Sequence, residues 1–499
     1  MTAKKEQYEC NFSSNQYNNP ILFGDFADPS ILRDGDDYYL VNSVCGEKKR
    51  LMPMWHSKDL VNWEFLYHVF EGVSLEGRPL YTAWAPELTK HNGIYYIYNY
   101  SPDFGTWVTT CDDIKKGNWS APISIKGVEG IDPGHVCDEE GNRYLCMSTN
   151  VMYPLAENGL SVTGEGVRIC ENWPIPDEYD IEGMCTESPK FFKRNGYVYF
   201  LTAQGGTMGP PTSHCVVAYR AKHPMGPYEI SPYNPIVHTK SKSHGWWSTG
   251  HGSLVDTPQG DTYIIYHGIR NAHRYLGRQA LMMPVTWTED GWFTVKDDDD
   301  MVQEISLQIE KNIREEKISI SPKDGKLGLF YNFDPEFNEK RLTFTDDCVY
   351  YDGEATVPWN SPAFAFMPQG YRYEYEVELR NVTDRSGFAI GYRFLDLANC
   401  GVAVSDGYIK LFKHSKYEWE NDKITIGSDT VFLKMRCDHG TVSYWVKQGD
   451  SDYIKFAHSY DTADWNPNMA SGFSYVNPCI WSFGPEKAEI TRCTYTNMD

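Results

Sequence analysis

The pattern of apolar and polar positions repeats five times along roughly the first 300 residues. In each copy, Pro or a small residue leads into an apolar pair, a Gly-containing polar turn follows, and then a strand rich in Tyr, Ile and Leu. This order predicts two antiparallel strands joined by a hairpin. The five copies cover residues 28–41, 85–98, 132–145, 188–201 and 251–266.

Successive copies begin about 45–65 residues apart, which is long enough for four strands each. Five such units predict a five-bladed β-propeller, and no long stretch shows helical periodicity, so the fold class is all-β. The innermost strands of a propeller meet around its axis, so polar residues at their starts should converge on one funnel. Those residues are Asp28, Trp84, Asp132, Glu187 and His251.

Three carboxylates in phase with the repeat indicate a chemical site. Like charges raise the pKa of one partner, which leaves an acid beside a base at neutral pH. Glycoside hydrolysis needs this pair, because one carboxyl protonates the leaving oxygen and another activates water or attacks the sugar. The competing explanation is local, since Asp before Pro is also ordinary turn chemistry. Because all three acids occupy the same place in the repeat, a shared chemical site is favoured over local turn chemistry.

The character of the chain changes near residue 320. An acidic run at 297–300 and a polar stretch at 310–317 precede this point. Residues 1–320 are therefore predicted to form the propeller and catalytic domain, and residues 321–499 an accessory β-sandwich of the jelly-roll kind. Strict alternation at 373–379 predicts a half-buried strand, and Asp406-Gly407 and His439-Gly440 predict tight hairpin turns. The sandwich either binds glycans or braces the propeller, and the lack of a Trp cluster favours bracing.

The amino-acid composition limits the classes of molecule that the protein is expected to bind. A net charge of −22 argues against nucleic acid and anionic membranes, whereas 15% aromatic residues suit a neutral sugar. No apolar stretch follows the Lys pair near the N-terminus and none is long enough to span a membrane, so a cytoplasmic location is expected. Thirteen Cys without a Cys-x-x-Cys pair suit reduced thiols better than disulfides or zinc. Motifs for nucleotide binding, serine hydrolysis and zinc proteolysis are absent, and no cofactor is required.

The residues that carry these predictions resemble glycoside hydrolase family 43, the β-xylosidases and α-L-arabinofuranosidases of plant cell-wall breakdown. The similarity runs in order through the predicted propeller, and the second half resembles the β-sandwich of xylosidase members by pattern alone. The matching stretches are Phe26-Ala27-Asp28-Pro29, Trp84-Ala85-Pro86-Glu87, Gly130-Ile131-Asp132-Pro133, Thr186-Glu187-Ser188-Pro189, Gly250-His251-Gly252-Ser253 and Gly277-Arg278-Gln279.

The resemblance implies roles for the three acids. Asp28 would be the general base, Glu187 the general acid, and Asp132 the third acid that orients Glu187 and tunes its pKa. Family members invert configuration, so the Asp28 and Glu187 carboxyls should lie about 6.5–9.5 Å apart, with room for a water. The resemblance also implies that a sandwich loop reaches over the funnel.

The resemblance further implies substrate-binding residues. Arg278 and His251 would bind the innermost sugar directly or through an ion or water, and Trp84 would be a stacking wall. Packing or a surface ion pair would also explain these three. A structural calcium ion near His251 is compatible with the resemblance, although no acidic loop of calcium-binding spacing is present. Trp107, Trp246 and Trp247 are expected on loops between blade strands, where any of them could shape outer sugar subsites. The sequence does not choose among these three, and none is assigned a function.

Several functions remain open at this point. The leading prediction is an exo-acting β-1,4-xylosidase acting on xylo- or arabinoxylo-oligosaccharides. An α-L-arabinofuranosidase or a bifunctional enzyme is the first alternative, because xylopyranose and arabinofuranose present similar hydroxyls. A non-catalytic glycan-binding propeller is the alternative from another class. A retaining, invertase-like propeller is set aside because its motifs are absent. The sequence leaves the oligomeric state open, a homo-oligomer included.

Overall fold

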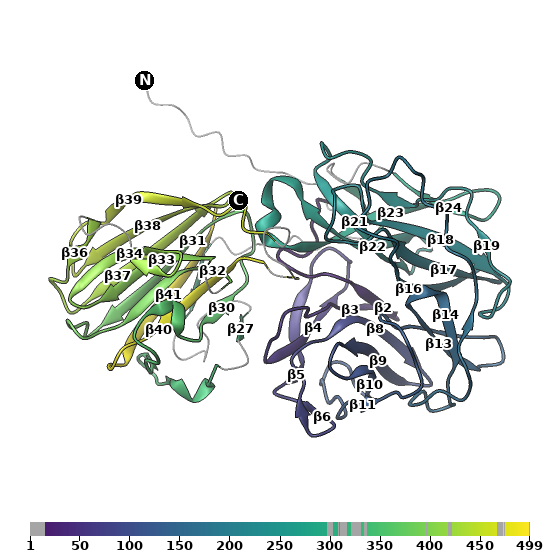
Figure 1. Cartoon of the computed structure of the whole chain (residues 1–499), viewed down its shortest axis with the longest axis horizontal. Coiled ribbons are helices and arrows are strands. Elements are labelled where there is room, and N and C mark those ends of the chain that lie inside the picture. The colour runs from purple at the N-terminus through teal and green to yellow at the C-terminus, as the bar shows by residue number, and fades with distance from the viewer. Residues whose placement is uncertain are drawn as a thin grey trace.

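The computed structural model describes residues 15–296, 303–307, 309, 317–320, 331–333, 337–395, 398–417, 422–466, 473 and 475–498. It consists of strands with a few short 3-10 turns. Figure 1 shows two bodies side by side, a propeller coloured purple to teal and a sandwich coloured green to yellow. This arrangement confirms the predicted five-bladed propeller followed by a β-sandwich.

The propeller consists of five antiparallel sheets in chain order. Blades 1 and 2 are β2 (Ser30–Asp34), β3 (Asp37–Val41), β4 (Arg50–Ser57) and β5 (Glu64–Glu71), then β8 (Trp84–His91), β9 (Ile94–Ser101), β10 (Gly105–Cys111) and β11 (Ile123–Ser124). Blade 3 is β12 (Gly134–Cys137), β13 (Arg143–Met147), β14 (Val151–Pro154) and β15 (Val167–Arg168). Blade 4 is β16 (Thr186–Arg194), β17 (Tyr197–Gln204), β18 (Cys215–Ala221) and β19 (Glu229–Ile230), with β20 (Val237–His238) paired to β18. Blade 5 is β21 (Trp246–Asp256), β22 (Thr262–Arg270), β23 (Arg278–Trp287) and β24 (Phe293–Val295).

Each pair of neighbouring blades shares an apolar cluster, which explains why both faces of the blade strands are apolar. Blades 1 and 2 pack through residues such as Met54 and Ile97, and blades 5 and 1 through Met282 and Leu40. The inner strands β2, β8, β12, β16 and β21 contact one another in this order, and β21 contacts β2 again. The ring is therefore closed around one axis.

The five inner strands share one backbone bend, which lies just before or near the start of four of them and within β21. Asp28, Ala85, Asp132, Ser188 and His251 all have φ between 45° and 61°, although none is glycine. A left-handed conformation costs a non-glycine residue roughly 1–2 kcal/mol, and such residues cluster at functional sites. Register shifts accompany the bend in β8, β16 and β21. The bends coincide with the phase of the sequence repeat and set the direction of the side chains at the axis.

The second domain is a sandwich of two antiparallel sheets. The first has the order β28 (Leu342–Phe344), β29 (Val349–Tyr351), β41 (Ala488–Asn497), β31 (Arg372–Arg380), β37 (Val431–Asp438), β38 (Thr441–Gln448) and β39 (Ile454–Asp461), with β26 (Lys317–Ile320) paired to β41. The second has the order β27 (Tyr331–Phe333), β30 (Phe364–Phe366), β40 (Asn477–Ser482), β32 (Phe388–Leu395), β33 (Ala398–Ser405), β34 (Tyr408–Lys413) and β35 (Lys416–Tyr417), with β36 (Ile424–Thr425) paired to β34.

Predicted details of the sandwich agree with the structure. Buried and partly exposed residues alternate along β31, as the sequence pattern predicted. Both residues of Asp406-Gly407 and of His439-Gly440 have positive φ, which is the geometry of two-residue hairpin turns. The predicted domain boundary after residue 320 stays a prediction, and β26, which ends at Ile320, already pairs with β41 of the sandwich.

Short elements complete the described structure. β1 (Gln16–Tyr17) pairs with β25 (Gln303–Glu304), and β6 (Ser74–Leu75) pairs with β7 (Arg78–Pro79). The 3-10 turns are η1 (Ser148–Asn150), η2 (Asn271–Leu276), η4 (Glu339–Arg341) and η5 (Pro358–Asn360). Over the described ranges, no helix has the length and apolar character needed to cross a membrane. The cysteines of these ranges are free thiols.

The two domains contact each other at η2, the turn between β22 and β23. The N–H of Val476 in the sandwich donates to the Tyr275 carbonyl of η2 at 2.8 Å. Nε2 of His273 in the same turn lies 2.8 Å from Nδ1 of His439 in the sandwich. Because η2 immediately precedes β23, these contacts fix the sandwich next to Arg278, the first residue of that strand.

Candidate active site

Asp28 lies at the start of blade 1 and is almost completely buried. Its Oδ1 is 3.2 Å from Nη1 of Arg278, the first residue of β23. Its Oδ2 accepts a hydrogen bond from Ser43 Oγ at 2.5 Å. Ser43 Oγ also accepts from the N–H of Ala85 at 2.6 Å, so one hydroxyl joins the start of blade 2 to the Asp28 carboxylate. These contacts hold both carboxylate oxygens in place.

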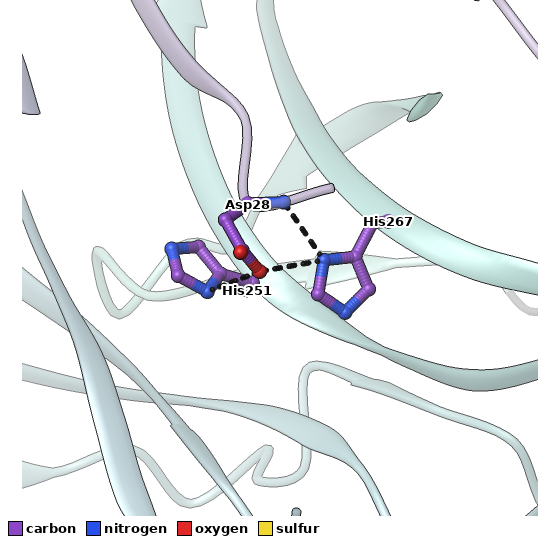
Figure 2. Close-up of side chains that lie close together, drawn as sticks. All are labelled: Asp28, His251 and His267. Carbon is purple, nitrogen blue, oxygen red and sulfur yellow. Dashed lines mark hydrogen bonds and ion pairs between the residues drawn. The ribbon is translucent and has the colours of Figure 1, made fainter. Parts of the chain in front are cut away.

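Two imidazoles of blade 5 flank the same carboxylate (Figure 2). Nδ1 of His251 and Nδ1 of His267 each lie 3.2 Å from Oδ1 of Asp28. The backbone N–H of Asp28 donates to Nδ1 of His267 at 3.0 Å, and Nε2 of His267 lies 3.0 Å from Thr207 Oγ1. Burial lowers the pKa of His267 to about 4 and also lowers that of His251, so both rings are neutral near pH 7.

Asp28 stays ionised in spite of its burial. Burial alone would raise the pKa of this carboxyl, but the Arg278 guanidinium, followed by His251, outweighs it and holds the pKa well below its usual range. Asp28 in turn contributes to a raised pKa at Arg278. The backbone N–H of Arg278 donates to Asp25 Oδ1 at 2.8 Å, which fixes the start of β23.

Glu187 and Asp132 have the opposite electrostatic character. Burial, and after it the Asp28 charge, raise the pKa of Glu187 to about 7. Burial, then Glu187 and Asp28, raise the pKa of Asp132 well above its usual range. Oδ2 of Asp132 accepts a hydrogen bond from the N–H of Ser188 at 3.2 Å. Asp132 therefore holds the backbone next to Glu187, and the pair retains a proton at neutral pH.

The structure thus brings the three predicted acids together and separates their pKa values. An ionised carboxylate can accept a proton from water, and a protonated carboxyl can give one to a leaving oxygen. One positive charge, on Arg278, lies beside Asp28 and favours the ionised form of this acid. The predicted separation of the Asp28 and Glu187 carboxyls stays a prediction.

Trp84 and a residue of the sandwich form one side of the site. The Trp84 ring lies 5.9 Å from the ring of Phe473, in an edge-on orientation, and its Nε1 donates to the Cys45 carbonyl at 3.3 Å. The Arg278 guanidinium carbon lies 4.6 Å from the centre of the Phe473 ring. A residue of the second domain therefore contacts two of the predicted sugar-binding residues.

Several residues of the site were not predicted. Ser43, His214 and His267 lie on or beside the later strands of their blades, whereas the sequence argument used only the starts of the inner strands. The expected loop positions of three aromatic residues were wrong: Trp107 lies within β10, and Trp246 and Trp247 lie within β21. Trp107 and Trp246 are buried in the core between blades. Trp247 is partly exposed, and the Arg274 guanidinium lies 5.3 Å from its ring.

The protein atoms around His251 offer few calcium ligands, and the predicted calcium ion stays a prediction. Asp28, His251 and His267 place one possible ligand atom each within 4.8 Å of one another. Calcium prefers six to eight oxygen ligands, whereas this set offers one oxygen and two nitrogens. The oxygen already contacts the positively charged Arg278. In this structure the two histidines contact the Asp28 carboxylate.

The inner strands of the propeller thus hold one carboxyl that keeps its proton and another that is ionised. This combination is typical of the active sites of glycoside hydrolases. Residues 17–293 match the family model of the glycosyl hydrolases family 43. This range covers more than half of the chain, and the protein belongs to this family.

Curated relatives match over the propeller. A non-reducing end alpha-L-arabinofuranosidase of Bacteroides ovatus is 34% identical over 312 residues, which are 58% of this chain and 55% of that protein. A xylan 1,3-beta-xylosidase of a Vibrio species is 31% identical over 318 residues, 54% of this chain and 56% of that protein. The match thus spans about half the length of these relatives.

Solved structures match over nearly the whole chain. A GH43 protein of Bacillus licheniformis has a TM-score of 0.82 and 23% identity, covering 97% of this chain and all of that one. A xylan beta-1,4-xylosidase of Bacillus halodurans has a TM-score of 0.79 and 22% identity, covering 96% of this chain and all of that one. At this identity the likeness supports the two-domain fold alone.

Proposed function

We propose that this protein is an inverting, exo-acting glycoside hydrolase that releases xylose from xylo-oligosaccharides, with Asp28 as general base and Glu187 as general acid. The observation that carries the proposal is the opposite pKa shift of these two carboxyls around one arginine. Asp28 has the charge to take a proton from water, and Glu187 keeps a proton for the leaving oxygen. Asp132 is proposed to hold the backbone beside Glu187 and to raise the proton affinity of the pair.

An exo mode of action is supported by Phe473. This residue comes from the sandwich and lies against Trp84 and Arg278, so it narrows one side of a funnel that a propeller alone would leave open. A pocket with one blocked side accepts the end of a chain more readily than its middle. Sugar-binding roles for Trp84, His251 and Arg278 are part of the proposal. They are supported by the contacts of His251 and Arg278 with Asp28 and by the contact of Trp84 with Phe473.

Release of α-L-arabinofuranose is the second candidate. It is favoured by the name of the Bacteroides ovatus relative, whereas the name of the Vibrio relative favours xylose. The two relatives share about the same identity with this chain, so sugar preference and linkage are open to measurement.

The test combines a substrate panel with product stereochemistry. Initial rates are compared on β-1,4-xylobiose, β-1,3-xylobiose and an arabinofuranosyl-substituted xylo-oligosaccharide, and proton NMR follows the first product. The proposal expects α-xylose from β-1,4-xylobiose, because water attacks the face opposite the leaving group. Release of β-xylose would make Asp28 a nucleophile and overturn inversion. Turnover of none of the substrates, with binding retained, would favour a glycan-binding protein.

A further inference from the structure

A buried histidine with no assigned role faces the proposed general acid. His214 immediately precedes β18, and its side chain is completely buried. Its Nε2 lies 4.0 Å from Oε1 of Glu187. Its ring stacks on that of His267, with the ring centres 5.3 Å apart and the planes 7° from parallel. Within the described part of the chain, neither ring nitrogen has a hydrogen-bond partner.

The surrounding backbone makes room for this ring. A Cβ atom on Gly250 of β21 would lie 1.8 Å from Cδ2 of His214, so only glycine fits opposite it. The preceding residue is also held: Ser213 Oγ donates to the Gly205 carbonyl and accepts from the N–H of Glu182. A buried polar group without a partner is unfavourable and in native proteins calls for an explanation. The surrounding backbone therefore fixes the position of His214, although the unpaired ring nitrogens lower the stability of the folded protein.

His214 is surrounded by other ionisable groups and is neutral. Burial, followed by the His267 and His251 rings, lowers its pKa well below the ordinary value. Asp28 and Arg278 also act on it, with opposite signs. A neutral imidazole carries hydrogen on one nitrogen only, and Nε2 is the nitrogen that faces Glu187. The ionisable groups that face Glu187 are Asp28, Asp132, Glu182, Cys185, Arg278 and His214.

We propose that His214 is a positioning residue for Glu187, and that its Nε2–H donates a hydrogen bond to the Glu187 carboxylate as that group ionises during catalysis. The inference rests on the proposed function. Glu187 gives its proton to the leaving oxygen while the bond from that oxygen to the anomeric carbon breaks and its electron pair stays on the oxygen. A small rotation of the Glu187 side chain shortens the 4.0 Å contact to hydrogen-bond length. His214 keeps its own proton throughout and stabilises the new charge.

The test compares His214→Phe, which removes the donor, with His214→Gln, which keeps an N–H at similar reach. kcat and kcat/KM are measured against pH on β-1,4-xylobiose and on 4-nitrophenyl β-xyloside. In His214→Phe, we expect the alkaline limb of kcat/KM on xylobiose to move up by about one pH unit and kcat to fall about 10-fold, as for loss of a hydrogen bond to a charged group. The nitrophenyl substrate, which scarcely needs the acid, should lose much less. His214→Gln should restore part of both changes.

His135→Gln is the matched control for replacing a buried imidazole. His135 lies on β12, is buried and accepts a hydrogen bond from Arg143, away from Glu187. This variant should leave the alkaline limb in place. If His214→Phe does not fold, His214→Asn takes its place, because its shorter side chain cannot reach Glu187 and should give the same shift.

Two outcomes separate this inference from the proposed function. If Glu187→Gln abolishes the alkaline limb but a folded His214→Phe or His214→Asn leaves it in place, or loses activity equally on both substrates, His214 is structural and the inference fails. If Glu187→Gln keeps the wild-type alkaline limb, Glu187 is not the general acid and the proposed function fails with it.

Discussion

The guanidinium of Arg278 lies over the ring of Phe473, with its central carbon 4.6 Å from the ring centre. Arg278 belongs to the last blade and Phe473 to the sandwich, and the same guanidinium contacts Asp28 at 3.2 Å. The lack of a Trp cluster favours a sandwich that only braces the propeller, whereas the family resemblance implies a loop over the funnel. The contact connects the sandwich to the proposed base through one side chain, and a loop over the funnel stays a prediction.

We expect Phe473→Ala to lower kcat/KM on xylobiose by about 3- to 30-fold. A cation–π contact contributes about 0.5–2 kcal/mol, and its loss frees Arg278 and opens one side of the funnel. The loss should fall mainly on KM, because Phe473 is not near the transferred proton. Phe344→Ala is the matched control, since Phe344 is an exposed aromatic of the same domain. Equal kinetics of the two variants would show that Phe473 has no part in binding.

Asp28→Asn and Glu187→Gln should each lower kcat on xylobiose by at least 10²–10⁴-fold, the usual contribution of a general acid or base. The two variants should differ on 4-nitrophenyl β-xyloside, whose leaving group scarcely needs protonation. There Glu187→Gln should retain much of the wild-type rate and Asp28→Asn should not. Circular dichroism checks that both variants fold. Equal losses on both substrates would argue against the assignment of the two roles.

The pH dependence of kcat/KM on xylobiose should show a plateau that ends near pH 7. Glu187 must be protonated to act as an acid, so activity falls as pH rises through its pKa of about 7. Asp28 must be ionised, and because its pKa is held well below the usual range, activity falls only at strongly acidic pH. Arg278→Met should move the acidic limb to higher pH, because the largest stabiliser of the Asp28 charge is lost. An unmoved acidic limb would contradict this electrostatic account.

The fold and the three acids could be predicted because each copy of the repeat has its polar residue at the same position. Each copy begins its inner strand at the same bend, so Asp28, Asp132 and the residue after Glu187 occupy equivalent places on the axis. Periodicity also predicted the strands of the sandwich, where one face of each strand is buried. These features depend on local pattern, which a single sequence contains.

The remaining site residues depend on contacts that no local pattern encodes. His267 reaches Asp28 from the second strand of blade 5, and His214 reaches Glu187 from the segment before β18. Phe473 arrives from another domain, in a stretch without strand periodicity. Trp107 and Trp246, expected on loops, lie in blade strands and are buried, because the core between blades takes up large aromatic side chains.

A buried ion pair at the centre of the propeller gives a test of how the site is held. Lys190 Nζ of β16 lies 2.6 Å from Glu87 Oε2 of β8, and both side chains are at most 10% exposed. Glu87 also accepts hydrogen bonds from Ser30 Oγ of β2 and from the N–H of His135 in β12. One carboxylate thus joins four of the five inner strands, at whose starts the three acids lie.

We expect Lys190→Met and Glu87→Met each to lower the free energy of unfolding by about 3–5 kcal/mol, because each leaves a buried charge without its partner. The double variant should be destabilised by less than the sum of the two, since it leaves no unpaired charge at this place. Urea unfolding followed by tryptophan fluorescence measures the three variants, with Lys116→Met as the control because its ion pair with Asp113 is exposed. Additive effects, or single effects no larger than that of the control, would show that the pair does not hold the inner strands together.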